Sequence, residues 1–268
     1  MTDLLKYIHE DCIDILRDID KVCRSNGIKY SLCGGSVIGA KLFNDIIPWD
    51  DDVDLMMDRQ NYDKFLEVYS KEKKNKYAIV NYNLVNCEDV PALFSRIVDM
   101  DTEVVEKIGA GDQKIGHVFV DITVFDNVKN KFSYKINELF RYYVYSFYYK
   151  INNIVPGNKY KRMIYKLFGK ARYGSKLYKT YKNYDNYCSR YKMRNTKYCA
   201  ELLGTIFPGR IYTKDIFNEY IDIQFSDIKA MIIKDYDKYL FQRYNRTEFT
   251  KENKAGNHTH IISYRRLK

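Results

Sequence analysis

The chain has 268 residues, and 45 Lys and Arg against 35 Asp and Glu give it a formal net charge of +10. Hydrophobic residues make up 46% and charged residues 30%, which excludes a largely disordered chain, and this length can bury a core without disulfides or structural metals. A basic chain attracts polyanions such as nucleic acid, nucleotides and anionic lipid, and the position of the charge along the chain decides among them.

Helices and strands are expected to alternate in the first half of the chain. Apolar residues at helical spacing predict an amphipathic helix over Leu4–Asn26, and Gly27 is suited to end it. A short strand is expected at Lys29–Cys33, running into Gly34-Gly35, and another at Val53–Met57. Runs rich in β-branched and aromatic residues predict further strands at Tyr77–Val85, Leu93–Asp99 and His117–Phe125. Shorter helices are expected between them, at Ser36–Phe43 and Asn61–Tyr69.

The composition changes sharply between Lys129 and Lys182. This segment holds eleven Lys and three Arg against a single acid, Glu138, together with fifteen Tyr and Phe. Pro156-Gly157 divides it into two expected helices, and the chain beyond it is expected to be mostly helical around Tyr212–Tyr244. The sequence therefore predicts three parts: a core at 1–128 that carries the candidate site, a basic Tyr/Phe-rich helical segment at 129–182, and a helical C-terminal part at 183–268 that packs on the core.

Targeting signals and cysteine spacing indicate the compartment. Residues Met1–Ile19 hold carboxylates throughout and lack the apolar stretch of a secretory signal. The most apolar long stretch, Ile136–Val155, contains Glu138, Arg141 and Lys150, so we expect no membrane span. The six Cys residues show no Cys-x-x-Cys pair, which favours reduced thiols in a cytoplasmic protein, located in solution or at the inner face of the cell membrane.

A glycine turn and an acidic run form the most informative stretch of the sequence. Gly34-Gly35-Ser36 follows an expected strand and opens an expected helix, where backbone N–H groups can receive a phosphate. Asp52 and Asp54 alternate with the apolar Val53 and Leu55, so both carboxylates are expected on one face of a strand. Two hard oxygen ligands side by side suit Mg²⁺ or Mn²⁺.

A third carboxylate is expected to complete this metal site. Asp121 is the one acid inside an apolar, β-branched stretch, where an isolated charge is expensive unless it is paired, metal-bound or exposed. With three carboxylates we expect two ions when a donor is bound. Arg96, on a neighbouring expected strand, is either a phosphate clamp or a surface residue. Asp50 and Asp51 either support the metal ligands or are solvated.

The order of these elements resembles the nucleotidyltransferase fold, and a longer match resembles the LicD family. The similar stretches are Asn26–Tyr30, Gly34–Ser36, Gly39–Ala40, Ile47–Asp54, Asp58–Phe65, Phe119–Ile122 and, more weakly, Tyr236–Tyr244. The resemblance implies an α+β fold, with a nucleotidyltransferase-type mixed sheet flanked by helices, a basic aromatic helical insertion and a helical C-terminal part.

The resemblance implies metal-dependent transfer of a phospho-headgroup with release of CMP. Phosphocholine from CDP-choline is the expected donor group, and a sugar or alditol hydroxyl of a surface polymer precursor, such as teichoic acid, lipopolysaccharide or capsule, is the acceptor; fukutin-like relatives transfer ribitol phosphate. In this interpretation Asp52, Asp54 and Asp121 are catalytic and hold the metal, and phosphate contacts come from Gly34, Gly35, Ser36, Lys41 and Arg96. Trp49 is the candidate contact for a choline headgroup, because quaternary ammonium groups bind to aromatic faces.

Two other functions remain open from the sequence. A nucleotidyltransferase would attack the α-phosphorus of CTP or ATP and release pyrophosphate, and a non-catalytic protein would bind membrane or RNA. Residues 129–182 carry a net charge of +13 and the rest of the chain −3, so the positive charge is concentrated in one segment. The composition of that segment favours peripheral contact with an anionic membrane or a lipid-linked acceptor over contact with nucleic acid. The alternative without a binding function is a helical subdomain with a solvated Lys face. His258 and His260 lie in a polar tail without an assigned role.

Overall fold

The computed structural model describes residues 3–72, 75–84, 93–108, 112–143, 175–203, 210–246, 248–251 and 260–267. In these residues the helices are α1 (Asp3–Ser25), α2 (Gly34–Phe43), α3 (Arg59–Lys71), α4 (Lys131–Tyr143), α7 (Ser175–Cys188) and α8 (Tyr236–Tyr244), with 3-10 turns η3 (Ser189–Tyr191) and η4 (Lys214–Phe217). The strands are β1 (Ser31–Leu32), β2 (Val53–Asp58), β3 (Tyr77–Val80), β4 (Ser95–Asp99), β5 (Thr102–Ile108), β6 (Asp112–Gly116), β7 (Phe119–Val128), β8 (Tyr198–Ala200), β9 (Ile211–Thr213), β10 (Tyr220–Phe225), β11 (Ile228–Ile233) and β12 (Ile261–Arg266).

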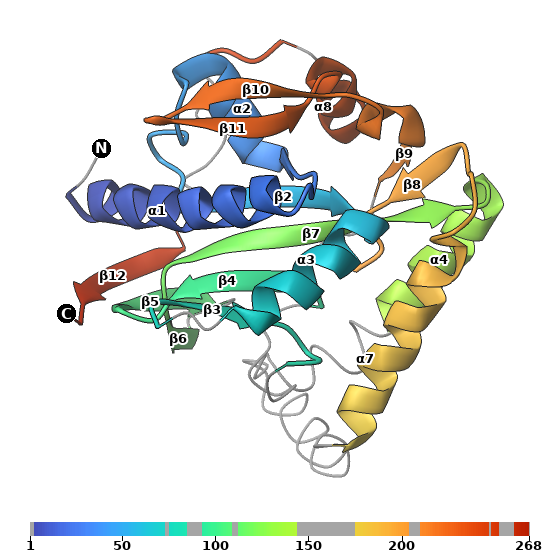
Figure 1. The fold of residues 1–268 in the computed structure, drawn as a ribbon, viewed down its shortest axis with the longest axis horizontal. Coiled ribbons are helices and arrows are strands. Elements are labelled where there is room, and N and C mark those ends of the chain that lie inside the picture. The colour runs from blue at the N-terminus through green and yellow to red at the C-terminus, as the bar shows by residue number, and fades with distance from the viewer. Residues whose placement is uncertain are drawn as a thin grey trace.

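A mixed sheet forms the centre of the molecule (Figure 1). Its strand order is β1-β2-β7-β4-β3, and β8 and β9 extend it at the end of β7. β2 and β7 run parallel, with Asp54 opposite Asp121, whereas β4 is antiparallel to β7 and places Arg96 opposite Asp121. β7 is buried along its whole length, which explains its continuous apolar character. The predicted α+β architecture with a mixed sheet is confirmed.

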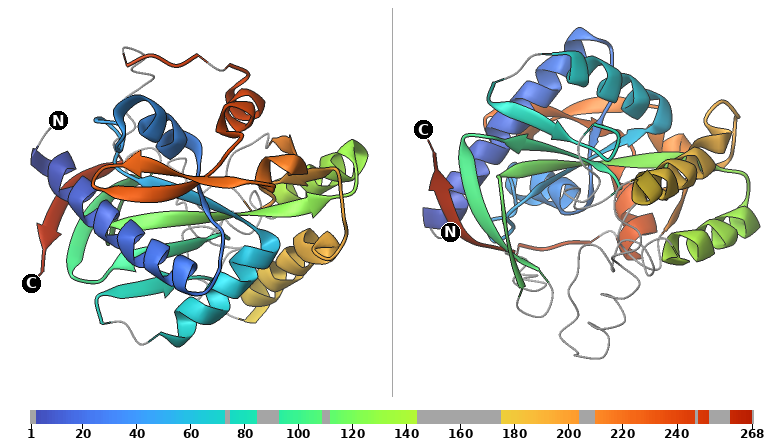
Figure 2. Two further views of the ribbon diagram at one scale, coloured as in Figure 1. Left: turned by 45° about the horizontal axis from the view of Figure 1, so that its top comes forward. Right: turned by 90° about the horizontal axis from the view of Figure 1, so that it is seen from below.

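Helices α1 and α3 contact each other and β7, so they cover one face of this sheet (Figure 2, left). In α1 the residues Ile8, Cys12, Ile15 and Ile19 follow helical spacing and are fully buried. The helix ends at Ser25, before Gly27 in a left-handed conformation with φ +61°. Burial of this apolar stripe therefore attaches α1 to the sheet, as the sequence predicted.

The prediction of a mostly helical C-terminal part is wrong. Residues 220–233 form the β10–β11 hairpin, and β8, β9 and β12 are strands as well; α8 is a helix. The reversal occurs at Ser226-Asp227, where Ser226 adopts φ +53°. In β10 the apolar Ile221, Ile223 and Phe225 alternate with Asp222 and Gln224, which is the period of a strand. The short apolar run of β11 was ambiguous between helix and strand.

A second small sheet was not predicted. The β5–β6 hairpin pairs with β12, so the end of the described chain returns to a hairpin from the middle of the sequence. β12 also contacts α1, and Tyr264 of β12 donates a hydrogen bond to buried Asp11. β12 therefore lies next to α1, although most of its side chains are exposed (Figure 1).

The basic aromatic segment is described at its two ends. α4 and the start of α7 are helical, while 144–174, including the break expected at Pro156-Gly157, lie outside the described residues. One of its cations is in the core: Arg141 is 1% exposed, donates to the Glu201 carbonyl and pairs with Glu138 at 2.7 Å. No helix in the described ranges is both long and apolar enough to cross a membrane.

Candidate active site

The turn into α2 brings the backbone against Asp54. Gly34 has φ +55°, and a Cβ at this position would lie 3.3 Å from Asp54 Oδ2, so glycine suits both the conformation and the space. The Gly34 amide donates to the Tyr239 hydroxyl at 3.0 Å. The Cys33 amide donates to the Asp54 carbonyl at 2.8 Å. The first turn of α2 is thereby fixed beside the carboxylate strand.

Gly39 allows the acidic loop to fold back over α2. A Cβ at Gly39 would meet the Asp45 carbonyl oxygen at 2.5 Å, a contact with backbone that no side-chain movement could relieve. Farther along the loop, the His9 Nε2 atom of α1 lies 2.8 Å from the Asp50 carbonyl oxygen. Both contacts hold the loop that delivers the acidic run to the start of β2.

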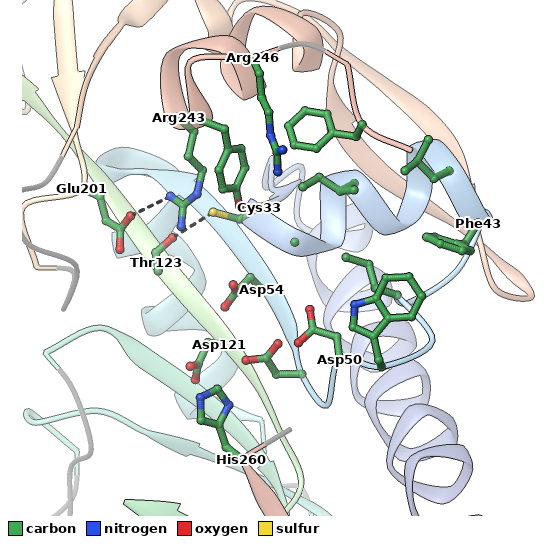
Figure 3. A pocket seen from close by; sticks show the side chains of 18 of the residues that line it. Cys33, Phe43, Asp50, Asp54, Asp121, Thr123, Glu201, Arg243, Arg246 and His260 are labelled. Atoms are coloured by element: carbon green, nitrogen blue, oxygen red, sulfur yellow. Dashed lines mark hydrogen bonds and ion pairs between the residues drawn. The ribbon is translucent and has the colours of Figure 1, made fainter. Parts of the chain in front are cut away.

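The predicted carboxylates gather in one pocket (Figure 3). Asp52 comes from the residue before β2, Asp54 from β2 and Asp121 from β7, and all three line a cavity of about 630 Å³. Gly35 and Trp49 line it too. A cavity of this size fits a nucleotide-sized ligand.

Burial and mutual repulsion make Asp52 and Asp54 reluctant to ionise. Burial, and then the charge of Asp54, raise the pKa of Asp52 well above its ordinary value. Burial and the charge of Asp121 raise the pKa of Asp54 to about 7, although Arg243 acts in the opposite direction. A divalent cation would relieve this repulsion.

The donor set therefore fits Mg²⁺ or Mn²⁺, which prefer carboxylate oxygens. Among the described residues, Asp50, Asp51 and Asp52 form a group whose ligand atoms lie within 4.8 Å of one another. Asp51 Oδ2, however, already accepts the amides of His260 and Ile261, at 2.5 and 2.7 Å. Asp50, Asp52 and Asp54 all line the cavity, so these are the carboxylates of the acidic run that could hold a metal there.

Asp51 acts as an anchor for the C-terminal strand. Its side chain is 3% exposed, and it joins the acidic loop to the first residue of β12. We expect Asp51→Ala to lower the free energy of unfolding by about 1–3 kcal/mol, because the buried Ile261 amide and the partly buried His260 amide lose their acceptor. Urea unfolding and amide hydrogen exchange of β12 measure this. Unchanged exchange at Ile261 would contradict the anchoring role, and Asp51→Asn, which retains an acceptor oxygen, is the matched control.

Arg96 does not face the pocket as a free phosphate clamp. Its Nε atom donates to Asp121 Oδ1 at 2.7 Å and its Nη2 atom to Oδ2 at 3.2 Å, while Nη1 lies 3.5 Å from Glu106 Oε1. The guanidinium also lies over the Phe119 ring, 3.3 Å from its centroid. Arg96 and Asp121, which were predicted to act separately, therefore form an ion pair, and Arg96 fixes the orientation of Asp121.

Two further predicted phosphate contacts have other partners. Lys41 pairs with Asp237 of α8 at 2.6 Å and is not among the residues that line the cavity. The Ser36 amide donates to the Cys33 carbonyl at 3.0 Å, and its hydroxyl accepts the Asp54 amide at 2.9 Å. Ser36 therefore positions Asp54, and of the glycine turn it is Gly35 that reaches the cavity.

The C-terminal part supplies pocket residues that the sequence analysis did not single out. Arg243 of α8 pairs with Glu201 at 3.4 Å, and burial raises the pKa of Glu201. Arg246 and Phe249 follow α8, and His260 precedes β12. Bonding to Asp51 raises the pKa of His260, whose side chain is 64% exposed. The signal for Arg243 was its place in the weak Tyr236–Tyr244 match; nothing in the local sequence marked the others.

Comparison with known proteins identifies the family of the chain. The model of the family described as "LicD/FKTN/FKRP, nucleotidyltransferase domain" matches residues 27–167, more than half of the chain. The lipopolysaccharide cholinephosphotransferase LicD of Haemophilus influenzae is 33% identical over 124 residues, 45% of this chain and 43% of that protein. An uncharacterized protein of Rickettsia typhi is 24% identical over 178 residues, 66% of this chain and 47% of that protein. The chain thus spans less than half the length of these two relatives, and it belongs to the LicD/FKTN/FKRP nucleotidyltransferase domain family.

Proposed function

We propose that the chain transfers phosphocholine from CDP-choline to a sugar or alditol hydroxyl of a surface polymer precursor and releases CMP. The observation that carries the proposal is the meeting of Asp52, Asp54 and Asp121 with Gly35 in one nucleotide-sized pocket. The activity named for the Haemophilus relative, a lipopolysaccharide cholinephosphotransferase, supports the headgroup and the class of acceptor.

In the proposed reaction the acceptor hydroxyl oxygen attacks the distal phosphorus of the donor. The bond from that phosphorus to the bridging oxygen breaks, and CMP leaves with the bridging oxygen. Asp52 and Asp54 would hold Mg²⁺ or Mn²⁺, with two ions when the donor is bound, and the ions would neutralise charge on the diphosphate. Asp121, oriented by Arg96, would complete the metal site or accept the hydroxyl proton.

The choline end of the donor requires a surface that attracts a quaternary ammonium. Trp49 lines the pocket and packs edge to face with Phe43, with ring centroids 5.7 Å apart. Aromatic faces stabilise such cations by about 0.5–2 kcal/mol. Trp49 beside Asp50 is therefore the proposed headgroup contact.

Parallel incubations with CDP-choline and with CTP test the function. We expect CMP from CDP-choline in the presence of Mg²⁺, and no CMP after chelation with EDTA. Pyrophosphate from CTP, without CMP from CDP-choline, would instead identify a nucleotidyltransferase. Release of neither product, with acceptor extract present, would favour a non-catalytic binding protein.

We further propose that the basic segment contacts an anionic membrane, where lipid-linked acceptors would be reached. α4 exposes Phe132, Leu139 and Phe140, at 73%, 72% and 49% exposure, beside the cations Lys131 and Lys135. Apolar side chains next to Lys suit the headgroup level of a bilayer. Co-sedimentation with phosphatidylglycerol vesicles is expected to fall in Phe132→Ser/Leu139→Ser and to be unchanged in the matched surface variant Met193→Ser. Equal sedimentation of both variants would contradict this contact.

A further inference from the structure

The two arginines of the pocket lie at one end of it, where Glu201 pairs with Arg243 (Figure 3). Arg243 and Arg246 lie at one end, Asp50 lies at the other, and Asp54 lies between them. A ligand with a negative part and a positive part therefore meets complementary charge in only one direction. CDP-choline is such a ligand, since its nucleotide diphosphate is anionic and its choline is cationic.

The Arg246 end combines a guanidinium with aromatic rings. Arg246 is exposed and lies over the Phe249 ring, 4.6 Å from its centroid, and no carboxylate of the described residues forms an ion pair with it. Phe249 packs edge to face on Tyr244, with centroids 5.6 Å apart. Arg243, in contrast, is occupied by Glu201. A guanidinium stacked on an aromatic ring suits a planar base and an adjacent phosphate.

The opposite end is aromatic and acidic. Phe43 and Trp49 meet edge to face, and Asp50 follows Trp49 directly in the chain. The Lys251 ammonium lies over the Phe43 ring at 5.5 Å from its centroid, so that ring face accepts a cation, and choline would take the place of this ammonium. With Lys251 displaced, the Trp49 and Phe43 rings and the Asp50 carboxylate suit a quaternary ammonium.

We propose that the pocket binds its donor in one direction, with the cytidine monophosphate at Arg246 and Phe249 and the choline at Trp49 and Phe43. This inference rests on the proposed function and deepens it by assigning the nucleotide end. The reverse direction would place choline against the Arg246 guanidinium and phosphates against Asp50. Arg246 and Phe249 are then donor-binding residues that recognise the nucleotide.

The single Trp of the chain makes the direction measurable. The two halves of the donor, phosphocholine and CMP, are titrated separately into the whole chain with Mg²⁺, and Trp fluorescence is recorded. We expect phosphocholine to change the Trp49 emission. CMP is expected to bind by calorimetry with little change in that emission, because its site lies at the other end.

Variants at each end separate the two halves. Arg246→Ala is expected to weaken CMP binding about tenfold and to leave phosphocholine binding unchanged. Phe43→Leu is expected to weaken phosphocholine binding and to leave CMP binding unchanged. The matched controls are Arg194→Ala, at an exposed Arg that also lies over an aromatic ring (Tyr191) but outside the pocket, and Phe140→Leu, at an exposed Phe of α4.

Three results have distinct meanings. Loss of CMP binding in Arg246→Ala but not in Phe43→Leu supports the direction. Loss of CMP binding in Phe43→Leu with retention in Arg246→Ala, or strong quenching of Trp49 by CMP alone, overturns it. If the unaltered chain binds CMP, phosphocholine and CDP-choline not at all, the proposed function itself fails, and with it the direction.

Discussion

Asp54→Asn is expected to lower CMP release from CDP-choline by about 1000-fold while the protein remains folded. The substitution removes a carboxylate from the pocket without changing its shape. Because burial and Asp121 already raise the pKa of Asp54 to about 7, a neutral amide relieves repulsion in the folded state. The temperature of unfolding without metal should therefore stay the same or rise.

The matched control for this variant lies on the same strand. Asp58 is at the far end of β2, outside the pocket, and caps α3 by accepting the amides of Gln60 and Asn61. Asn is nearly as good a helix cap as Asp, so Asp58→Asn should retain both activity and stability. Equal activity of Asp54→Asn and Asp58→Asn would show that Asp54 is not a catalytic residue.

The second large effect is on stability. Arg59 at the start of α3 is 4% exposed and pairs with Asp126 of β7, which is fully buried, through contacts of 2.7 and 2.8 Å. Its Nη1 atom also lies 2.8 Å from Asp185 of α7. We expect Arg59→Met to lower the free energy of unfolding by about 3–5 kcal/mol, because it leaves Asp126 charged and unpaired in the core. Urea unfolding measures the change.

Two comparisons identify the mechanism of this loss. In Arg59→Met/Asp126→Leu both buried groups are apolar, and part of the stability should return. Arg17→Ala removes an exposed ion pair with Asp227 and should cost less than about 1 kcal/mol. If Arg59→Met lowered the free energy of unfolding no more than Arg17→Ala, the buried Arg59–Asp126 pair would not hold α3 on the sheet.

The first half of the fold was predictable because its patterns are local. The apolar stripe of α1, the alternation of acidic and apolar residues at the start of β2 and the β-branched run of β7 each determine an element without reference to distant residues. The hairpin β10–β11 was missed because its short apolar run fits either a helix or a strand. The pairing of β12 with β5 joins residues about 160 positions apart, for instance Arg265 with Glu103, and no local pattern specifies such a pairing.

The candidate site was likewise predictable where it depends on local spacing and not where it depends on contacts between distant segments. The spacing of Asp52 and Asp54 was enough to predict a shared face, and the structure places both in the pocket with Asp121. The pairing of Arg96 with Asp121 depends on the antiparallel register of β4 and β7, which the sequence does not reveal. Arg246 and His260 reach the pocket only because the C-terminal part folds back over it.

The central claim is that the acceptor oxygen attacks the distal phosphorus of CDP-choline. Slow hydrolysis of the donor in ¹⁸O-labelled water tests this without knowledge of the acceptor, because water then stands in for the hydroxyl and its oxygen stays on the phosphorus attacked. Mass spectrometry of the Mg²⁺-dependent products should find the label in phosphocholine and none in CMP. Label in CMP would show attack at the nucleotide phosphorus and would contradict the account.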